Sequence, residues 1–183
     1  GLNGGGEVLL VDPELAFTRD TVYANYGRLP IAPTLKNKWR VETLWTSANE
    51  RVATVDQDGR LTVKGVGEAE ISAIFVGDDV YQADTASYVL IVKKGEAEVT
   101  FPVKLYTTVQ GSTDNEWPVA TVKPEELSVV YSSSNGNVAI VNRTTGAVTL
   151  QGVGNAVITA AFTGNDYYAA AEATYTLSVA KPN

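Results

Sequence analysis

The segment WTSANERVATVDQDGRLTVKGVGEAEISAIFVGDDVYQADTASYVLIVKK (45–94) decides the fold, because the chain contains it twice. The second copy is YSSSNGNVAIVNRTTGAVTLQGVGNAVITAAFTGNDYYAAAEATYTLSVAK (131–181), in which Thr145 is one extra residue. Of 50 aligned positions, 23 are identical, and self-similarity at a fixed spacing is the mark of repeated structural units. We therefore expect two copies of one structural module.

The spacing of the copies sets the expected domain bounds. Val52 and Val138 are equivalent and lie 86 residues apart, which is an ordinary size for a small domain. We expect a flexible N-terminal tether at 1–6, a first module at 7–94 and a second module at 95–183. A linker of only a few residues around Lys94 would leave the modules little room to tumble independently.

Apolar and polar residues alternate through the repeated segment. Every second residue from Ala69 to Phe75 is apolar or small, and the same alternation runs from Tyr88 to Val92. This period of two is typical of half-buried strands, and the turn sequences between the runs contain glycine. No stretch of ten or more residues has a helical stripe of apolar residues. The pattern predicts an all-β chain with about seven strands per module, arranged as a two-sheet sandwich.

The first third of each module is less regular, because prolines interrupt short apolar runs. Proline cannot donate a hydrogen bond to a sheet, so such runs belong at edges and turns. We expect first strands at 8–11 and 99–101. We expect further strands at 34–36 and 121–123, just before the shared block.

Composition excludes several classes of function. The chain contains no histidine and no cysteine, which removes the usual general base, the usual transition-metal ligands and any disulfide. Its net charge of −7 disfavours nucleic acid, whose binding needs a basic surface. No apolar run approaches the roughly 20 residues of a spanning helix. We expect no catalytic residues, no cofactor, no metal, no nucleic-acid partner and no membrane insertion by this segment.

Several motifs together resemble a known family, the bacterial Ig-like group 2 (BIG2-type) repeat. They are WTSANERVATVD (45–56), GVG (65–67) and AEISAIF (69–75). FVGDDVY (75–81) and FTGNDYY (162–168) are similar to the variant of Bacteroides-type surface proteins. The resemblance covers about fifty residues of each module.

The resemblance implies two tandem immunoglobulin-like β-sandwich domains on the bacterial cell surface. Such modules belong to lipoproteins, with a lipid anchor upstream, or to longer surface proteins. They serve in adhesion or as structural spacers and stalks, and they share no active site. The alternative is a carbohydrate-binding accessory module of a surface glycan-uptake or glycan-degrading system. We expect a monomer whose partner is an unidentified protein or glycan at the cell surface.

Two groups of carboxylates have the residue types of a calcium site, which takes oxygen ligands. Asp56 and Asp58 precede Gly59 in a predicted hairpin. Asp78 and Asp79 form the second group, of which only Asp79 is shared with the second copy, as Asp166. A carboxylate in a turn also accepts hydrogen bonds from nearby backbone N–H groups. We favour this structural role for both groups over calcium.

The candidate ligand-binding residues are Trp117, Lys36, Lys38 and Arg40. The three basic residues alternate, which would place them on one face of a strand with Trp39 on the other. They form either an anionic-glycan site or, as we prefer, a solvated strand face. Trp117 follows a polar loop sequence (112–116). It either stacks on a sugar or packs on its own sandwich, and we favour packing.

Overall fold

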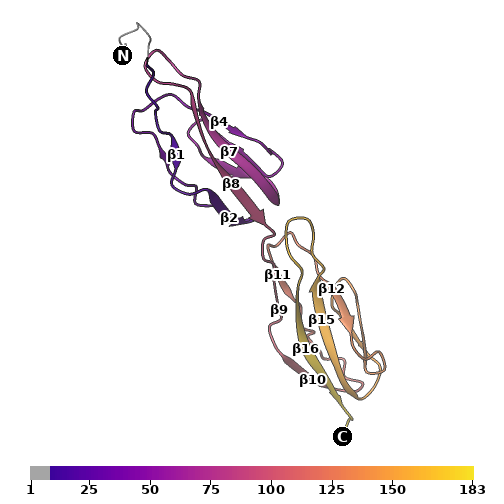
Figure 1. The fold of residues 1–183 in the computed structure, drawn as a ribbon. Helices are drawn as coiled ribbons and strands as arrows, with labels where there is room; N and C mark the ends of the chain where they lie inside the picture. The colour runs from indigo at the N-terminus through magenta and orange to yellow at the C-terminus, as the bar shows by residue number, and fades with distance from the viewer. Residues whose placement is uncertain (1–8) are drawn as a thin grey trace. The chain divides into compact units, whose positions relative to one another are not determined.

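The computed structural model describes residues 9–183, which form sixteen strands and no helix within that range (Figure 1). The chain divides into two compact units between Gly95 and Glu96, called unit 1 and unit 2 below. The predicted tether at 1–6 lies outside the described residues. Among residues 9–183 there is no helix of the length and hydrophobicity needed to cross a membrane.

Within residues 9–183, each unit contains eight strands in the same order along the chain. Those of unit 1 are β1 (Ala16–Phe17), β2 (Thr21–Asn25), β3 (Leu35–Lys36), β4 (Leu44–Ser47), β5 (Ala53–Val55), β6 (Leu61–Val63), β7 (Gly67–Phe75) and β8 (Asp84–Lys93). Those of unit 2 are β9 (Glu98–Thr100), β10 (Leu105–Val109), β11 (Thr121–Lys123), β12 (Val130–Ser133), β13 (Ala139–Val141), β14 (Val148–Leu150), β15 (Gly154–Phe162) and β16 (Ala171–Ala180).

The two units have the same sheet topology. The main sheet has the order β2-β8-β7-β4 in unit 1 and β10-β16-β15-β12 in unit 2. Short pairs, β1-β3 and β5-β6 in unit 1, supply the opposite side of the core, and β9-β11 and β13-β14 repeat them. Alternate residues of the long strands point into this core: Ile71, Leu90 and their equivalents Ile158 and Leu177 are fully buried. The all-β sandwich prediction is confirmed.

In each main sheet, the outermost strand at one edge is parallel to its neighbour. β2 pairs with β8 from Thr21 opposite Val89 to Asn25 opposite Lys93. β10 pairs with β16 from Leu105 opposite Thr176 to Val109 opposite Ala180. The other strand pairs in the two units are antiparallel. Each unit thus begins its main sheet with a strand that runs alongside the unit's last strand.

The prediction of a first strand at 8–11 is wrong over residues 9–11, and residue 8 lies outside the described residues. Leu9 and Leu10 are exposed, and Val11 forms only an isolated bridge with Tyr81. The early strand of the main sheet is β2, where Val22 and Ala24 point into the core. A strand joins this sheet when every second side chain points into the core, as Val22 and Ala24 do. A continuous apolar run such as 9–11 does not by itself place its side chains there. The strands predicted at 34–36, 99–101 and 121–123 match β3, β9 and β11 to within a residue.

An aromatic ring packs on the hairpin glycine of each unit. A Cβ atom at Gly59 would lie 2.9 Å from the Trp45 ring, and one at Gly146 would lie 2.7 Å from the Tyr131 ring. Both glycines also have positive φ, 81° and 78°, a conformation that favours glycine. Turn geometry and ring contact therefore both require glycine here.

Candidate ligand-binding site

The connection between β3 and β4 is a tight loop built around Asn37. Its side-chain Nδ2 donates to the carbonyl oxygen of Val41 at 2.8 Å, and its Oδ1 accepts the Val41 N–H at 3.0 Å. The Arg40 N–H donates to the carbonyl oxygen of Asn37 at 3.1 Å. The predicted strand face of Lys36, Lys38 and Arg40 is therefore wrong, because the strand ends at Lys36 and the chain then turns.

Arg40 has a φ of 55°. The left-handed conformation costs a residue with a Cβ atom about 1–2 kcal/mol, so the Asn37 hydrogen bonds must offset this cost. Strained backbone of this kind is often found at functional sites. Here the left-handed conformation of Arg40 lies between Trp39, which is exposed, and Val41, whose side chain is buried.

Trp39 lies at the tip of the loop and is 45% exposed. Lys38 Nζ is 4.9 Å from the centroid of the Trp39 ring, and the Tyr81 ring centroid is 6.0 Å away with an interplanar angle of 30°. The indole thus contacts two neighbouring side chains, while nearly half of the residue is exposed to solvent. Such a ring is a preorganised contact surface, because little side-chain entropy is left to lose on binding.

A groove of about 400 Å³ lies beside Trp39 and Tyr81. This is within the size range of small-molecule sites. Its walls combine apolar and ionisable side chains, and the ionisable ones besides Tyr81 are Arg40, Glu42 and Asp78. The groove brings together the β3–β4 loop, the exposed Leu44 of β4 and the loop after β7.

Asp78 holds the loop that contributes Tyr81. Its Oδ1 accepts the N–H groups of Val80 at 2.8 Å and Tyr81 at 2.7 Å. These bonds, the Tyr81 bond first, hold the pKa of the Asp78 carboxyl below its usual value. The carboxylate stays charged beside the groove at neutral pH.

The turn role expected for the pair Asp78 and Asp79 is confirmed at Asp78, and not at Asp79, the residue that the copies share as Asp166. The hydrogen bonds belong to the preceding residue, which is Asp78 in unit 1 and Asn165 in unit 2. Asn165 Oδ1 accepts the N–H groups of Tyr167 and Tyr168 at 2.8 and 2.7 Å. An amide can replace the carboxylate here because the turn needs only an acceptor oxygen, so identity between the copies points to the wrong residue.

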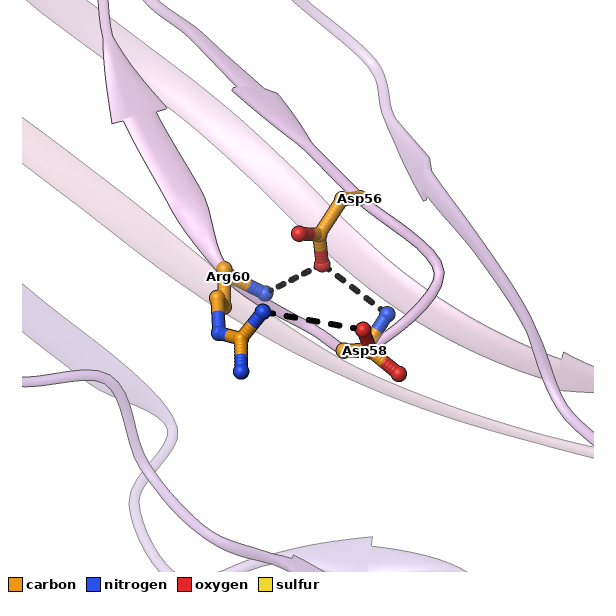
Figure 2. A network of polar contacts seen from close by, with 3 residues as sticks. All are labelled: Asp56, Asp58 and Arg60. Carbon is orange, nitrogen blue, oxygen red and sulfur yellow. Dashed lines mark hydrogen bonds and ion pairs between the residues drawn. The ribbon is translucent and has the colours of Figure 1, made fainter.

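The second acidic group closes a hairpin (Figure 2). Asp56 Oδ1 accepts the N–H groups of Asp58 and Arg60, both at 2.9 Å. The Arg60 N–H is the main cause that lowers the pKa of Asp56. In unit 2, Asn142 Oδ1 accepts the N–H groups of Thr144 and Thr145 in the same way. The turn interpretation is confirmed, and the described residues hold no cluster of three acidic side chains suited to a metal ion.

Trp117 is half-buried and packs against the core of unit 2. Its ring centroid lies 5.3 Å from that of Tyr106. The Tyr106 hydroxyl donates to Asn115 Oδ1 and accepts the Glu116 N–H, both at 3.1 Å. These contacts agree with the packing alternative, although one edge of Trp117 lines a polar hollow of about 370 Å³.

Of the candidate residues, the structure brings Arg40 to the groove and leaves Trp117 in the other unit. Sequence reasoning missed Trp39 as a contact residue, because the alternation placed it on the strand face opposite the three basic residues. A usable signal was its lack of a counterpart: the corresponding connection of unit 2, PEELSV (124–129), contains no aromatic residue.

The family described as Bacterial Ig-like domain (group 2) matches residues 31–87, which lie within unit 1. The match confirms the resemblance over most of the shared block of that unit. The narrower similarity to Bacteroides-type surface proteins stays a prediction. Comparison with curated proteins gives no match. No catalytic family matches this chain.

Solved structures with a similar fold share little sequence with this chain. The EC1-2 pair of human mucin-like protocadherin is 10% identical with a TM-score of 0.40, and the match covers 93% of this chain and 98% of that chain. Domains 4 and 5 of the S-layer protein SbsC are 17% identical with a TM-score of 0.38, and the coverage is 91% and 98%. These likenesses concern the fold of tandem β-sandwich domains alone.

A third similar structure is a SusE-like surface located polysaccharide binding protein from the Bacteroides thetaiotaomicron heparin utilisation locus. It is 15% identical with a TM-score of 0.35, and the match covers 90% of this chain. This chain spans about a third of that protein (33%). The likeness is again one of fold.

Proposed function

We propose that the chain is a non-enzymatic pair of Ig-like modules from a bacterial cell-surface protein, which bears tension as a spacer or as part of an adhesive stalk. The family match over unit 1 supports the bacterial Ig-like assignment. The absence of histidine and cysteine from the sequence supports a role without catalysis. The observation that carries the mechanical role is the parallel pairing of β2 with β8 and of β10 with β16.

Parallel pairing decides how tension would act on unit 2. β10 begins beside Thr176, whereas β16 ends beside Val109. Tension that passes through β9 into β10 and out of β16 pulls the two strands in opposite directions along their length. The hydrogen bonds between them are then loaded together in shear. In an unzipping geometry the same bonds would break one after another at lower force.

Backbone hydrogen bonds at both ends of each pair extend this clamp. The Thr176 N–H donates to the carbonyl oxygen of Lys104, and the Gln110 N–H donates to that of Ala180, both at 2.9 Å. In unit 1 the corresponding bonds join Val89 to Asp20 at 2.9 Å and Tyr26 to Lys93 at 2.8 Å. The ladder therefore continues one residue beyond each paired segment.

Single-molecule pulling along two axes tests the proposal. The chain has no cysteine, so introduced thiols define the axis without background. Handles at Lys104→Cys and Lys181→Cys pull β10 against β16 in shear. Handles at Gln110→Cys and Lys181→Cys unzip the same pair, since Gln110 lies beside the end of β16.

We expect a clearly higher unfolding force along the shear axis than along the unzipping axis. Equal forces, or a weaker shear axis, would contradict the tension-bearing role. Export to the cell surface, a lipid anchor upstream of this segment, the monomeric state and an adhesive partner stay predictions. Surface labelling of the intact protein in its host tests export.

A further inference from the structure

We propose that the groove beside Trp39 in unit 1 binds a short, uncharged saccharide. This inference goes beyond the tension-bearing role and does not depend on it, because the groove uses the β3–β4 loop and not the β2–β8 clamp. Four features support it: the exposed indole, the mixture of charges in the walls, the strained backbone at Arg40 and the absence of such a loop in unit 2.

The exposed indole suits the apolar face of a sugar ring. A pyranose has one face of C–H groups that packs on an aromatic ring, while its hydroxyl groups point outward. Trp39 is 45% exposed and held by Lys38 and Tyr81. Leu44, which is 52% exposed, extends the apolar wall. Aromatic walls with a few polar groups are the general composition of small-molecule sites.

The ionisable walls favour hydroxyl groups over a charged ligand. Arg40 can only donate hydrogen bonds, and the carboxylates of Glu42 and Asp78 can only accept them. A sugar hydroxyl both donates and accepts hydrogen bonds, so it can pair with the guanidinium as an acceptor and with either carboxylate as a donor. Two carboxylates in the walls would repel an anion, and the Arg40 guanidinium, with the Lys38 ammonium beside Trp39, would repel a cation, so the charges around the groove nearly cancel. An uncharged polyol therefore fits the charges of this groove best.

Two further observations indicate that the loop is kept for more than connecting strands. The left-handed backbone at Arg40 costs stability, and a glycine would remove that cost. Unit 2 joins the equivalent strands without an aromatic residue, since Glu125 and Glu126 occupy its connection. The scaffold therefore does not require Trp39 or Arg40, and unit 2 serves as an internal control that lacks the site.

Titration of the intact chain with neutral oligosaccharides tests the proposal. The probes are gluco-, xylo-, manno- and galacto-oligosaccharides of two to six units, with oligogalacturonates as the charged comparison. The readout is the indole N–H resonance of each of the three tryptophans in ¹⁵N spectra. We expect at least one neutral series to shift the Trp39 resonance and leave Trp117 unmoved.

Variants then assign the contacts. Trp39→Ala should weaken binding at least tenfold, and Trp39→Phe should retain part of it. Arg40→Gly keeps the backbone conformation and removes the guanidinium, so it should weaken binding while the protein stays folded. Trp117→Ala is the matched control and should bind as the native chain does. Melting temperatures of the variants check that they fold.

Three results would overturn the proposal. They are no response of Trp39 to any neutral probe at millimolar concentration, binding that survives Trp39→Ala, and tighter binding of oligogalacturonate than of every neutral probe. None of these results bears on the pulling experiment, so failure of the saccharide site is distinguishable from failure of the tension-bearing role.

Discussion

Unit 1 and unit 2 bury equivalent leucines of their last strands to the same depth, yet they present different surfaces in one connection. Leu90 and Leu177 are both 0% exposed, and each lies on the strand that ends its unit. Between β3 and β4, by contrast, unit 1 places an exposed Trp39 and a strained Arg40, where unit 2 has two glutamates. The difference teaches that the duplicated residues specify the scaffold, while the residues that the copies do not share are where binding is to be sought.

Removal of a core leucine should have the largest effect on stability, and the loss should be the same in both units. Leu90→Ala and Leu177→Ala should each cost about 2–5 kcal/mol of unfolding free energy, because each leaves a cavity in a close-packed core. Native-state hydrogen exchange reads the two units separately. The exposed Val119→Ala is the control and should cost less than about 0.5 kcal/mol. A large loss of unfolding free energy for only one of the two leucine variants would contradict the equivalence of the two cores.

A methyl group on the hairpin glycines should have the next largest effect. Gly59→Ala and Gly146→Ala should each cost roughly 2–4 kcal/mol, since they combine an unfavourable φ with a clash against Trp45 or Tyr131. Gly111 has a φ of 84°, but a Cβ atom there would meet no atom within 4 Å, so Gly111→Ala should cost only about 1–2 kcal/mol. Urea unfolding measures the loss of unfolding free energy in each variant. Equal losses at all three glycines would show that the contacts with the Trp45 and Tyr131 rings add nothing to the cost.

Alkaline pH should destabilise the two units alike through one tyrosine in each. The hydroxyls of Tyr88 and Tyr175 are buried with no hydrogen-bond partner among the described residues, and burial raises the pKa of each to about 12. The unfolded chain loses these protons near pH 10, so it binds fewer protons than the folded chain between about pH 10 and 12. Stability therefore falls with rising pH, by about 1.4 kcal/mol per tyrosine at pH 11.

Phenylalanine variants isolate this effect. Tyr88→Phe and Tyr175→Phe should be neutral or stabilising at pH 7, because the lost hydroxyl has no partner, and should remove their share of the alkaline loss. Tyr23 is 66% exposed, so Tyr23→Phe is the control for general titration. An alkaline loss that is unchanged in Tyr88→Phe would mean that this hydroxyl is solvated in the folded protein.

Removal of the Tyr131 hydroxyl should give the smallest effect, and Trp45, at the equivalent place in unit 1, has no such hydroxyl to lose. The Tyr131 hydroxyl accepts the Ala120 N–H at 3.0 Å, whereas Trp45 stands at the equivalent place in unit 1. Tyr131→Phe should cost about 1 kcal/mol through this bond, while Tyr175→Phe at pH 7 should not. Thermal unfolding of the two variants side by side measures the difference, and equal stability would contradict a role for the hydroxyl.

Most of the repeated block could be predicted, because alternation at Ala69–Phe75 and Tyr88–Val92 reports burial directly. The strands β2 and β10 could not be. Each is only five residues long, and each owes its place to a parallel partner that lies far along the chain. The exposed run Leu9–Val11 looks more like a strand than β2 does, because local hydrophobicity carries no information about that partner.

The candidate site was only partly predictable for a related reason. Lys36, Lys38 and Arg40 alternate like a strand, and no rule of sequence reveals that Arg40 takes a left-handed conformation usually left to glycine. The charge of Arg40 marks it as a candidate, and it does lie at the groove. The sequence around Trp39 and Trp117 does not distinguish an exposed tryptophan from a packed one. Tertiary packing leaves Trp39 exposed and Trp117 half-buried.

Stretching the intact chain through its two ends tests the central claim, that two copies of one scaffold each carry load as a unit. We expect two unfolding steps that release nearly equal lengths of chain, with no smaller steps before them. Gradual peeling of short segments, or a single step for the whole chain, would contradict the claim.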